Sequence, residues 1–269
     1  VYHSGPQEFG TTTRNYKNIQ VKQLSIREKF LFQKLPITDI LNHDIVIING
    51  NIRYLSNITL LVLCASLRVK TIWWGHLKSA NGSYFWMKLR LFVSRLATNI
   101  LFYTEREALI AKAKYNHPTF KTHYMSNGLD LENIRRFRKD YTPEQRSIDV
   151  LFCGRFTKKS NIGGLIAAIN SITTPLRVVL IGKSHNDQTA YTAHFKHHHN
   201  IEILDTKTDE EELSVYFNSA KLFVYPGSAG VSVIHAASYG VPVLIHDQWD
   251  KHMPEASIAR DYGSGQTYS

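Results

Sequence analysis

The stretch "VYPGSAGVSVIHAASYGVPVLIHDQWDKHMPE" (224–255) decides the fold class of the second half of the chain. The pattern predicts a strand that ends in a glycine-containing turn, then a helix of small residues. A second apolar strand follows, and the stretch ends at an acidic residue, Glu255. This order of strand, turn, helix and strand is one step of a parallel α/β sheet. The first turn of such a helix presents unpaired N–H groups, which suit an anion.

The same alternation extends outward from this stretch on both sides. In the first half of the chain, the hydrophobic pattern predicts strands at 44–50, 70–76 and 99–104 and helices at 57–69, 83–97 and 105–115. The second half predicts strands at 148–154, 176–182, 201–205 and 221–225 and helices at 161–172 and 209–220. The polar, charged segment 127–147 between them is expected to be a linker. We therefore predict two Rossmann-like parallel-sheet domains, 1–143 and 144–269, with a ligand site in the cleft between them.

The composition is that of a globular protein without membrane spans. Its longest apolar stretches run to about 8 to 10 residues, which is too short to cross a bilayer, and the N-terminus does not resemble a signal peptide. Cys64 and Cys153 lie in apolar segments, so we expect two buried, reduced thiols in a cytoplasmic protein rather than a disulfide.

The positive charge is concentrated in the first half of the chain. Residues 1–150 hold 22 Lys and Arg against 11 Asp and Glu. This favours an anionic partner such as a phospholipid surface, a lipid-linked phosphate or a nucleic acid, although a merely solubilising basic face is a simpler alternative. Because no helix-turn-helix, aromatic RNA platform or zinc module is recognisable, we expect no nucleic-acid partner. The basic, aromatic, amphipathic helix at 83–97 is the expected membrane contact.

Three strand ends in the second half carry glycine, two of them with basic residues directly after it. Glycine lets a ligand approach the backbone, and cations beside helix N–H groups suit a diphosphate. Each turn alone is ordinary, but together they predict one anion site. The residues concerned are Gly154, Arg155, Lys158, Lys159, Gly182, Lys183 and Gly230. The GxGxxG and GxxxxGK[ST] motifs are absent, which argues against a dehydrogenase or a P-loop ATPase.

Six of the 13 histidines fall into three groups. His76 follows the carboxyl end of a strand, where parallel sheets place functional groups, but a structural role fits equally. His235 lies inside the helix of the opening stretch and is either a ligand contact or a core histidine. His194 and His197–His199 indicate a solvated loop rather than a metal site, since no Cys or carboxylate stands at ligand spacing.

Several of these segments resemble one enzyme family. "GRF…K", "LIG", "DEEELSVYFNSAKLFVYPG", "G…AASYGVPVLIHD" and "MPE" resemble the C-terminal, donor-binding domain of family-4 retaining glycosyltransferases with the GT-B fold. "YMSNGLD" (124–130) resembles the Asn-Gly-x-Asp segment before their interdomain linker. "IWWGHLK" and "NILFYTEREALIAK" resemble the acceptor-side domain of a subgroup that builds bacterial surface polysaccharides. The resemblance covers about residues 44–265, so the chain is expected to be a fragment or a compacted variant, shortened at both ends.

The resemblance implies an activity and a place in the cell. A hexosyl- or related glycosyltransferase would move a sugar from a UDP-, GDP- or dTDP-sugar to a hydroxyl of a glycan or lipid-diphosphate-linked acceptor, with the anomeric configuration retained. The implied context is polysaccharide, lipopolysaccharide or capsule biosynthesis. The protein would be peripheral on the inner face of the plasma membrane, bound to anionic lipid through its basic first half.

The resemblance also implies a role for each candidate residue. Arg155 and Lys159 would hold the leaving diphosphate, and His76 would face the transferred sugar. The donor would be bound by Gly154, Lys158, Gly182, Lys183, Gly230, Val231, Ser232, His235 and Glu255. No cofactor and no obligatory metal are expected, because these cations would take the place of a metal.

Three positions depart from the family pattern. The family's two glutamates, one on each side of seven residues, fall on Gly227 and His235, and its phosphate-binding lysine falls on Ser160. In typical members the first glutamate meets the sugar and the second meets the ribose. An inert GT-B module that binds a nucleotide sugar or a partner protein is therefore the alternative.

Overall fold

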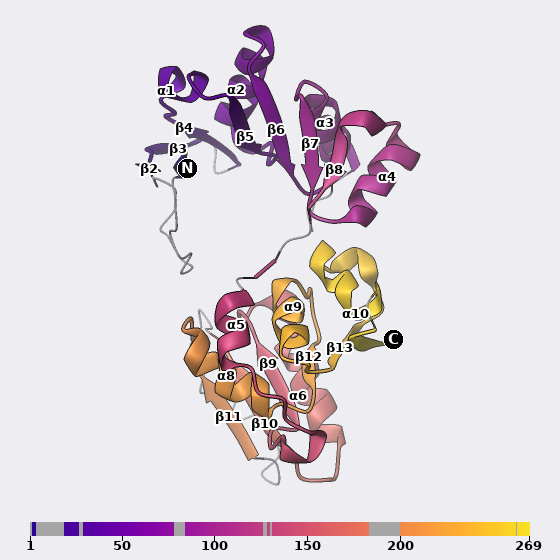
Figure 1. The fold of residues 1–269 in the computed structure, drawn as a ribbon. Coiled ribbons are helices and arrows are strands. Elements are labelled where there is room, and N and C mark those ends of the chain that lie inside the picture. The colour runs from indigo at the N-terminus through magenta and orange to yellow at the C-terminus, as the bar shows by residue number, and fades with distance from the viewer. Residues whose placement is uncertain are drawn as a thin grey trace. The chain divides into compact units, whose positions relative to one another are not determined.

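The computed structural model describes residues 2–3, 19–26, 29–77, 84–125, 128–129, 131–182, 200–261 and 263–269. The chain divides into two compact units, Val1–Ser126 and Asn127–Ser269, drawn in Figure 1. Each unit contains a parallel sheet with helices between its strands. The predicted α/β class with two Rossmann-like domains is confirmed.

The first unit is built on a four-stranded parallel sheet in the order β5-β6-β7-β8. Each helix after β5 leads to the next strand along the sheet, so right-handed crossovers place α2, α3 and α4 on one face. Trp73, Ile100 and Phe102 fill the core beneath them. The elements are β1 (Tyr2–His3), β2 (Ile19–Gln20), β3 (Gln23–Ile26), β4 (Phe30–Gln33), α1 (Ile37–Leu41), β5 (Ile45–Asn49), α2 (Leu55–Ser66), β6 (Lys70–Gly75), α3 (Tyr84–Ser94), β7 (Asn99–Phe102), α4 (Glu105–Tyr115), η1 (Thr119–Lys121) and β8 (Thr122–Tyr124).

The second unit contains a six-stranded parallel sheet in the order β11-β10-β9-β12-β13-β14. One buried cluster packs α5, α8, α9 and α10 on one face, and a second packs α6 on the other (Figure 1). The elements are α5 (Leu131–Phe137), η2 (Pro143–Gln145), β9 (Val150–Cys153), η3 (Lys158–Ser160), α6 (Ile162–Ser171), β10 (Arg177–Ile181), β11 (Asn200–Leu204), α8 (Glu210–Ser219), β12 (Phe223–Tyr225), α9 (Val231–Ser238), β13 (Val243–His246), η4 (Trp249–Lys251), η5 (Pro254–Ser257), α10 (Ile258–Asp261) and β14 (Gly265–Tyr268).

The predicted linker at 127–147 is wrong for most of its length. It contains α5, which packs on α8 and belongs to the second unit, so the units divide between 126 and 127 rather than between 143 and 144. Asn218 on α8 fixes the end of α5: its amide donates to the carbonyl of Phe137 at 2.9 Å and accepts from the N–H of Lys139 at 2.8 Å. These contacts come from residues about 80 positions further along, which local polarity does not reveal.

Arg146 joins the carboxyl ends of α8 and α9. Its buried guanidinium donates to the carbonyls of Phe217 (3.2 Å) and Ala220 (2.8 Å) at the end of α8. It also donates to the carbonyl of Tyr239 at the end of α9, at 3.3 Å. One positive charge thus satisfies carbonyl groups at two helix ends, where the helix dipoles favour a cation.

Candidate functional site

The order of the strands in the second unit fixes where a ligand can bind. From β9 the chain proceeds through α6 to β10 in one direction, and from β12 through α9 to β13 in the other. The order therefore reverses between the neighbours β9 and β12. In open α/β sheets the loops beyond the carboxyl ends of such a strand pair separate and leave a crevice for a ligand.

The loops that follow β9 and β12 pack directly against each other. The N–H of Ser228 donates to the carbonyl of Lys159 at 2.8 Å. A Cβ atom at Gly227 would overlap that same carbonyl oxygen, so no side chain fits there with this backbone. Gly227, the position to which the sequence resemblance assigned the first glutamate, thus brings two loops together.

Ser160 has a structural part in the first of these loops. It is buried, and its hydroxyl accepts from the N–H of Thr157 at 2.8 Å and donates to the carbonyl of Thr157 at 2.7 Å. These bonds close the turn of η3 and leave the two lysines before it exposed. The serine therefore shapes the loop at the position to which the sequence resemblance assigned a phosphate-binding lysine.

Three cations stand exposed on the loop after β9. Arg155, Lys158 and Lys159 form no ion pair with any described residue. Arg155 is close to Tyr225 at the end of β12: burial raises the pKa of that phenol, and the charge of Arg155 partly offsets the rise. The guanidinium consequently lies at the reversal point of the sheet.

The start of α9 offers backbone donors at the same edge. Its N-cap, Gly230, provides no side-chain cap, and within the described chain the N–H groups of Gly230, Val231 and Ser232 have no hydrogen-bond partner. The segment that contains Glu255 holds this start in place. The N–H of Met253 donates to the carbonyl of Ala229 at 2.9 Å, and η5 packs against α9 with Glu255 buried.

Gly182 supports the loop after β9 from the neighbouring strand. A Cβ atom there would overlap the carbonyl oxygen of Gly154, so the close approach requires glycine. The structure thus brings Gly154, Gly182 and Gly230 to the same carboxyl edge. Lys183, and the histidines 194 and 197–199, lie outside the described residues.

His235 is engaged in a hydrogen-bonded group that sequence reasoning missed. Its Nε2 lies 2.8 Å from Oε1 of Glu210 on α8, and the hydroxyl of Tyr239 donates to the same oxygen at 2.6 Å. The imidazole also packs on the ring of Phe217 at 4.3 Å between centroids. The charged run of α8 gave no sign of this pairing, because the partners come from another helix.

The carboxyl of Glu210 is held ionised. Burial alone would raise its pKa, but the hydrogen bonds from His235 and Tyr239 and the charge of His235 outweigh burial and keep the pKa below its usual value. Burial, followed by the charge of Glu210, raises the pKa of the Cys153 thiol to about 12. Cys153 ends β9, so the negative charge of Glu210 is felt at the reversal point, and the thiol stays protonated and unreactive.

In the first unit, His76 lies beside two buried charged side chains, those of Glu107 and Arg90. Its Nδ1 lies 3.9 Å from Oε1 of Glu107, and its ring stacks on Tyr103 with centroids 4.2 Å apart. Arg90 donates to the carbonyls of His76 (3.3 Å) and Leu77 (3.1 Å). Arg90 is itself buried; burial lowers its pKa, and the carboxylate of Glu107 opposes that shift.

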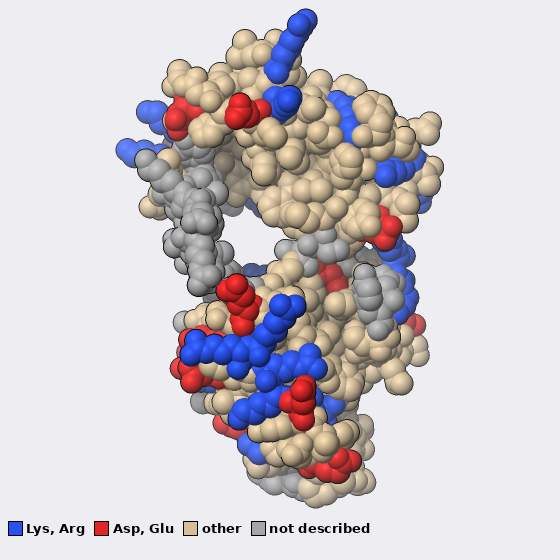
Figure 2. Space-filling model, viewed as in Figure 1, with Lys and Arg blue, Asp and Glu red and all other residues tan. Residues whose placement is uncertain are grey.

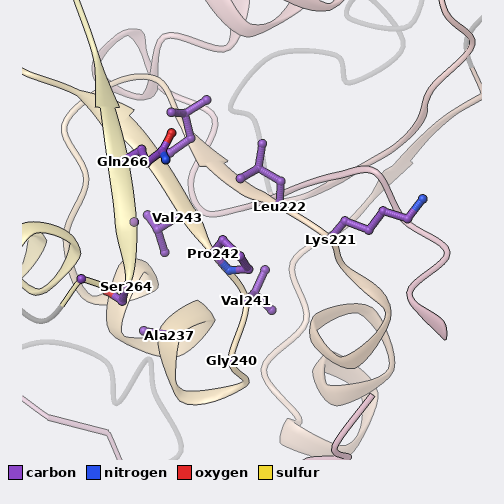
Figure 3. A pocket seen from close by; sticks show the side chains of 12 residues that line it. Lys221, Leu222, Ala237, Gly240, Val241, Pro242, Val243, Ser264 and Gln266 are labelled. Atoms are coloured by element: carbon purple, nitrogen blue, oxygen red, sulfur yellow. The ribbon is translucent and has the colours of Figure 1, made fainter. Parts of the chain in front are cut away.

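Other features of the described chain carry no sign of chemistry. Among the described residues no three His, Cys, Asp or Glu side chains gather as metal ligands, and no described helix is long and apolar enough to cross a membrane. A cavity of about 680 Å³ lies at the amino ends of β12 and β13, on the edge opposite the candidate site (Figure 3). Val241 and Pro242 line it, while Lys221 points away from them and pairs with Asp149 at 2.8 Å.

Part of the second unit matches a known family. Residues 133–260 match the family model described as glycosyl transferases group 1. The comparison with curated proteins gave no match. The family match contains the loops after β9 and β12, the start of α9 and Glu255.

Solved structures of similar fold cover between 76% and 87% of this chain. HepE from Anabaena in complex with UDP has a TM-score of 0.61 at 13% identity, over 87% of this chain and 66% of that one. A UDP-forming alpha,alpha-trehalose-phosphate synthase from Burkholderia xenovorans has a TM-score of 0.51 at 11% identity, over 76% and 59%. An alpha-glucosyltransferase in complex with UDP and a 13-mer DNA has a TM-score of 0.50 at 12% identity, over 78% and 62%.

These identities show the fold alone, which is the GT-B arrangement of two Rossmann-like domains. The chain spans just under two thirds of the length of the Anabaena protein.

Proposed function

We propose that the protein is a retaining glycosyltransferase that moves a sugar from a nucleotide diphosphate sugar to a hydroxyl group of an acceptor. One observation carries this proposal: three exposed cations and the uncapped start of α9 lie at the same edge of the sheet. This is the point between β9 and β12 where the strand order of a Rossmann-type sheet reverses. Such a site fits a diphosphate, which matches the leaving group of sugar transfer.

Stabilisation of the leaving group would supply most of the rate enhancement. Negative charge grows on the distal phosphate as the bond to the sugar breaks, and donors fixed in advance stabilise this charge more than that of the bound donor. Arg155 and Lys159 would neutralise it, and the N–H groups of Val231 and Ser232 would hold its oxygens. The proton of the acceptor would leave on the departing phosphate, so the chain needs no further general base, and His76 would face the transferred sugar.

The donor and the acceptor belong to the same proposal. Solved structures of similar fold contain UDP or UDP-glucose, so a UDP-sugar is the first donor to test, with GDP- and dTDP-sugars next. The acceptor proposed is a glycan or a lipid-diphosphate-linked sugar in the synthesis of surface polysaccharide, lipopolysaccharide or capsule.

A panel of nucleotides tests the donor site. The melting temperature of the protein is measured with UDP, GDP and dTDP, and release of nucleoside diphosphate is followed with the corresponding sugars. A shift with one nucleotide and slow hydrolysis of its sugar are expected. Binding without any hydrolysis or transfer would favour the inert module, a reading that the glycine at 227 and the engaged imidazole of His235 motivate. The absence of any shift would contradict the proposal.

We also propose that α3 attaches the first unit to an anionic membrane surface as a peripheral protein. Phe85 and Phe92 are 66% and 70% exposed, and Leu96 is also exposed. A spacing of seven residues puts Phe85 and Phe92 in one stripe of α3, with Lys88 between them, and Leu96 follows just past the end of the helix. Residues 1–126 hold 17 Lys and Arg against 6 Asp and Glu. On the face in Figure 2 the basic side chains of this unit are scattered, whereas a group gathers on the second unit over α5.

Flotation with lipid vesicles tests the attachment. The protein is expected to float with phosphatidylglycerol vesicles and to stay behind with phosphatidylcholine alone. The double variant Phe85→Ser, Phe92→Ser should lose most of the binding, while Leu109→Ser, which removes an exposed leucine on α4, should not. Equal flotation of both variants would reject α3 as the contact.

A further inference from the structure

Glu210 carries a charge that has no part in the proposed reaction. It opens α8, whose N-terminus follows the carboxyl end of β11. Its charge acts on Cys153 at the carboxyl end of β9, and its Oε1 contacts two residues of the α9 segment. The carboxylate therefore lies at the same edge of the sheet as the cations and the start of α9.

Only one of its two oxygens is engaged. His235 and Tyr239 both bind Oε1, and no described residue donates a hydrogen bond to Oε2. Oε2 is also not enclosed, since the side chain of Glu210 retains 21% of its exposure. A carboxylate fixed through one oxygen and open at the other can accept hydrogen bonds from a hydroxylated ligand.

The hydroxyl groups nearest to a bound nucleotide diphosphate are those of the ribose. In Rossmann-type sites an acidic side chain beyond the strand ends binds ribose hydroxyls, because an ionised carboxylate accepts both protons of a vicinal diol. Charge-assisted hydrogen bonds of this kind are the stronger ones. The Nε2 of His235 lies 2.8 Å from Oε1 of Glu210 and donates to that oxygen, so this nitrogen is not available to the ribose.

We propose that Glu210 binds the ribose hydroxyls of the donor, and that His235 and Tyr239 position its carboxylate. This inference rests on the proposed function, because it requires a nucleotide in the site. The contact to the ribose, which the sequence resemblance assigned to position 235 on α9, would thus come from Glu210 on α8. His235 would then be a positioning residue.

The test compares two ligands and three proteins by isothermal titration calorimetry. The ligands are UDP and 2′,3′-dideoxy-UDP, or the guanosine pair if GDP binds the wild type more tightly. The proteins are the wild type, Glu210→Gln, and Glu211→Gln as a matched control from the exposed side of the same helix turn. The wild type and Glu211→Gln should bind the dideoxy ligand about tenfold more weakly than the natural one, the loss typical of one charge-assisted contact.

Glu210→Gln should bind the natural nucleotide about tenfold more weakly and should lose little further affinity on removal of the diol. His235→Gln should keep part of the discrimination, since the carboxylate remains. If Glu210→Gln does not fold, Glu210→Asp withdraws the carboxylate by one methylene and should show the same loss.

Three results would overturn the inference, and they differ from failure of the proposed function. An unchanged affinity of Glu210→Gln for the natural nucleotide would show that Glu210 does not bind the diol. So would a further tenfold loss when Glu210→Gln is given the dideoxy nucleotide, because the effects of the substitution and of the missing diol would then be independent. If the wild type binds none of UDP, GDP and dTDP, the proposed function fails and the inference with it. If it binds dTDP alone, whose deoxyribose has no vicinal diol, the inference fails and the proposed function stands.

Discussion

At the scale of single residues, the site depends on glycines that bring backbone segments together and on cations that form no ion pair with the residues the structure describes. Gly227 meets the carbonyl of Lys159, and Gly182 meets that of Gly154. These approaches leave Arg155 and the lysines of η3 facing solvent at the reversal point. The charges are therefore available to a ligand because the glycines let the backbones approach.

Replacing Arg155 by alanine tests its role towards the leaving group. Transfer should fall about 100-fold or more, because a charge contact that strengthens in the transition state is lost. Initial rates with saturating donor measure the effect. Arg136→Ala removes an exposed arginine of α5 and serves as the control, with activity unchanged. Near-normal activity of Arg155→Ala would defeat the assignment.

Replacing Gly227 by alanine tests the contact between the loops. The added methyl group would overlap a carbonyl oxygen, so the loops must separate, at a cost of about 1–3 kcal/mol in unfolding free energy and with loss of nucleotide binding. Gly163→Ala is the matched control: no described heavy atom lies within 4 Å of its Cβ position, and it is helical. That variant should gain up to about 1 kcal/mol. Urea unfolding measures both, and equal stability of the two variants would refute the overlap.

The sequence predicted the glycines and cations of this site but not the buried partners of its histidines. Glycine followed by basic residues at a strand end is a local pattern, and the structure brings Gly154, Gly182 and Gly230 to one edge as expected. Glu210 lies 25 residues from His235, and Glu107 lies in a different element from His76. Only tertiary packing creates these pairs, so no spacing in the chain reveals them.

At the scale of elements, His117 connects three segments of the first unit. It is buried, and its two ring nitrogens lie 3.0 Å from the hydroxyl of Ser94 on α3 and 2.9 Å from that of Thr122 on β8. Burial lowers its pKa; a backbone hydrogen bond partly opposes this, and the charges of Arg95 and Lys121 lower it further. The folded unit thus prefers the neutral imidazole.

The stability of the first unit should consequently depend on pH. The unfolded chain takes up a proton near pH 6.5, and the folded chain takes it up at lower pH, so this contribution is lost as pH falls below about 6.5. Melting temperatures between pH 7.5 and 5 measure the loss. His117→Gln should melt lower at pH 7.5 and show a shallower pH dependence. Parallel curves for wild type and variant would contradict this account.

Element positions agree with the sequence where periodicity is strong and differ where tertiary contacts decide. The predicted helices at 105–115 and 209–220 correspond to α4 and α8, because acids at their starts and regular apolar spacing define both. The segment that contains α5 is polar enough to be taken for a linker. Its single buried side chain, Ile134, gives too weak a periodic signal.

At the scale of the whole molecule, the two units have separate cores. One buried cluster lies wholly within the first unit, and two lie wholly within the second. A domain with its own core can fold alone. The site proposed for the diphosphate and the ribose is built within the second unit.

Expression of residues 127–269 alone should therefore give a folded protein with one cooperative melting transition. UDP, or the nucleotide that binds the full chain, should raise its melting temperature, since a ligand stabilises the form it binds. Residues 1–126 expressed alone are the control and should show no shift. A shift of the first unit, with none in the second, would place the nucleotide elsewhere.

Arg146 has a consequence for how the donor site behaves when it is filled. One guanidinium fastens the carboxyl ends of α8 and α9, and the bonds of His235 and Tyr239 to Glu210 fasten the two helices again near the start of α8. Because α8 is joined near both of its ends to the carboxyl end of α9, we expect the two helices to move together. The N–H groups at the start of α9 and the carboxylate of Glu210 should therefore keep the same distance from each other before and after the nucleotide binds. Because these groups need not be ordered on binding, binding should cost little conformational entropy.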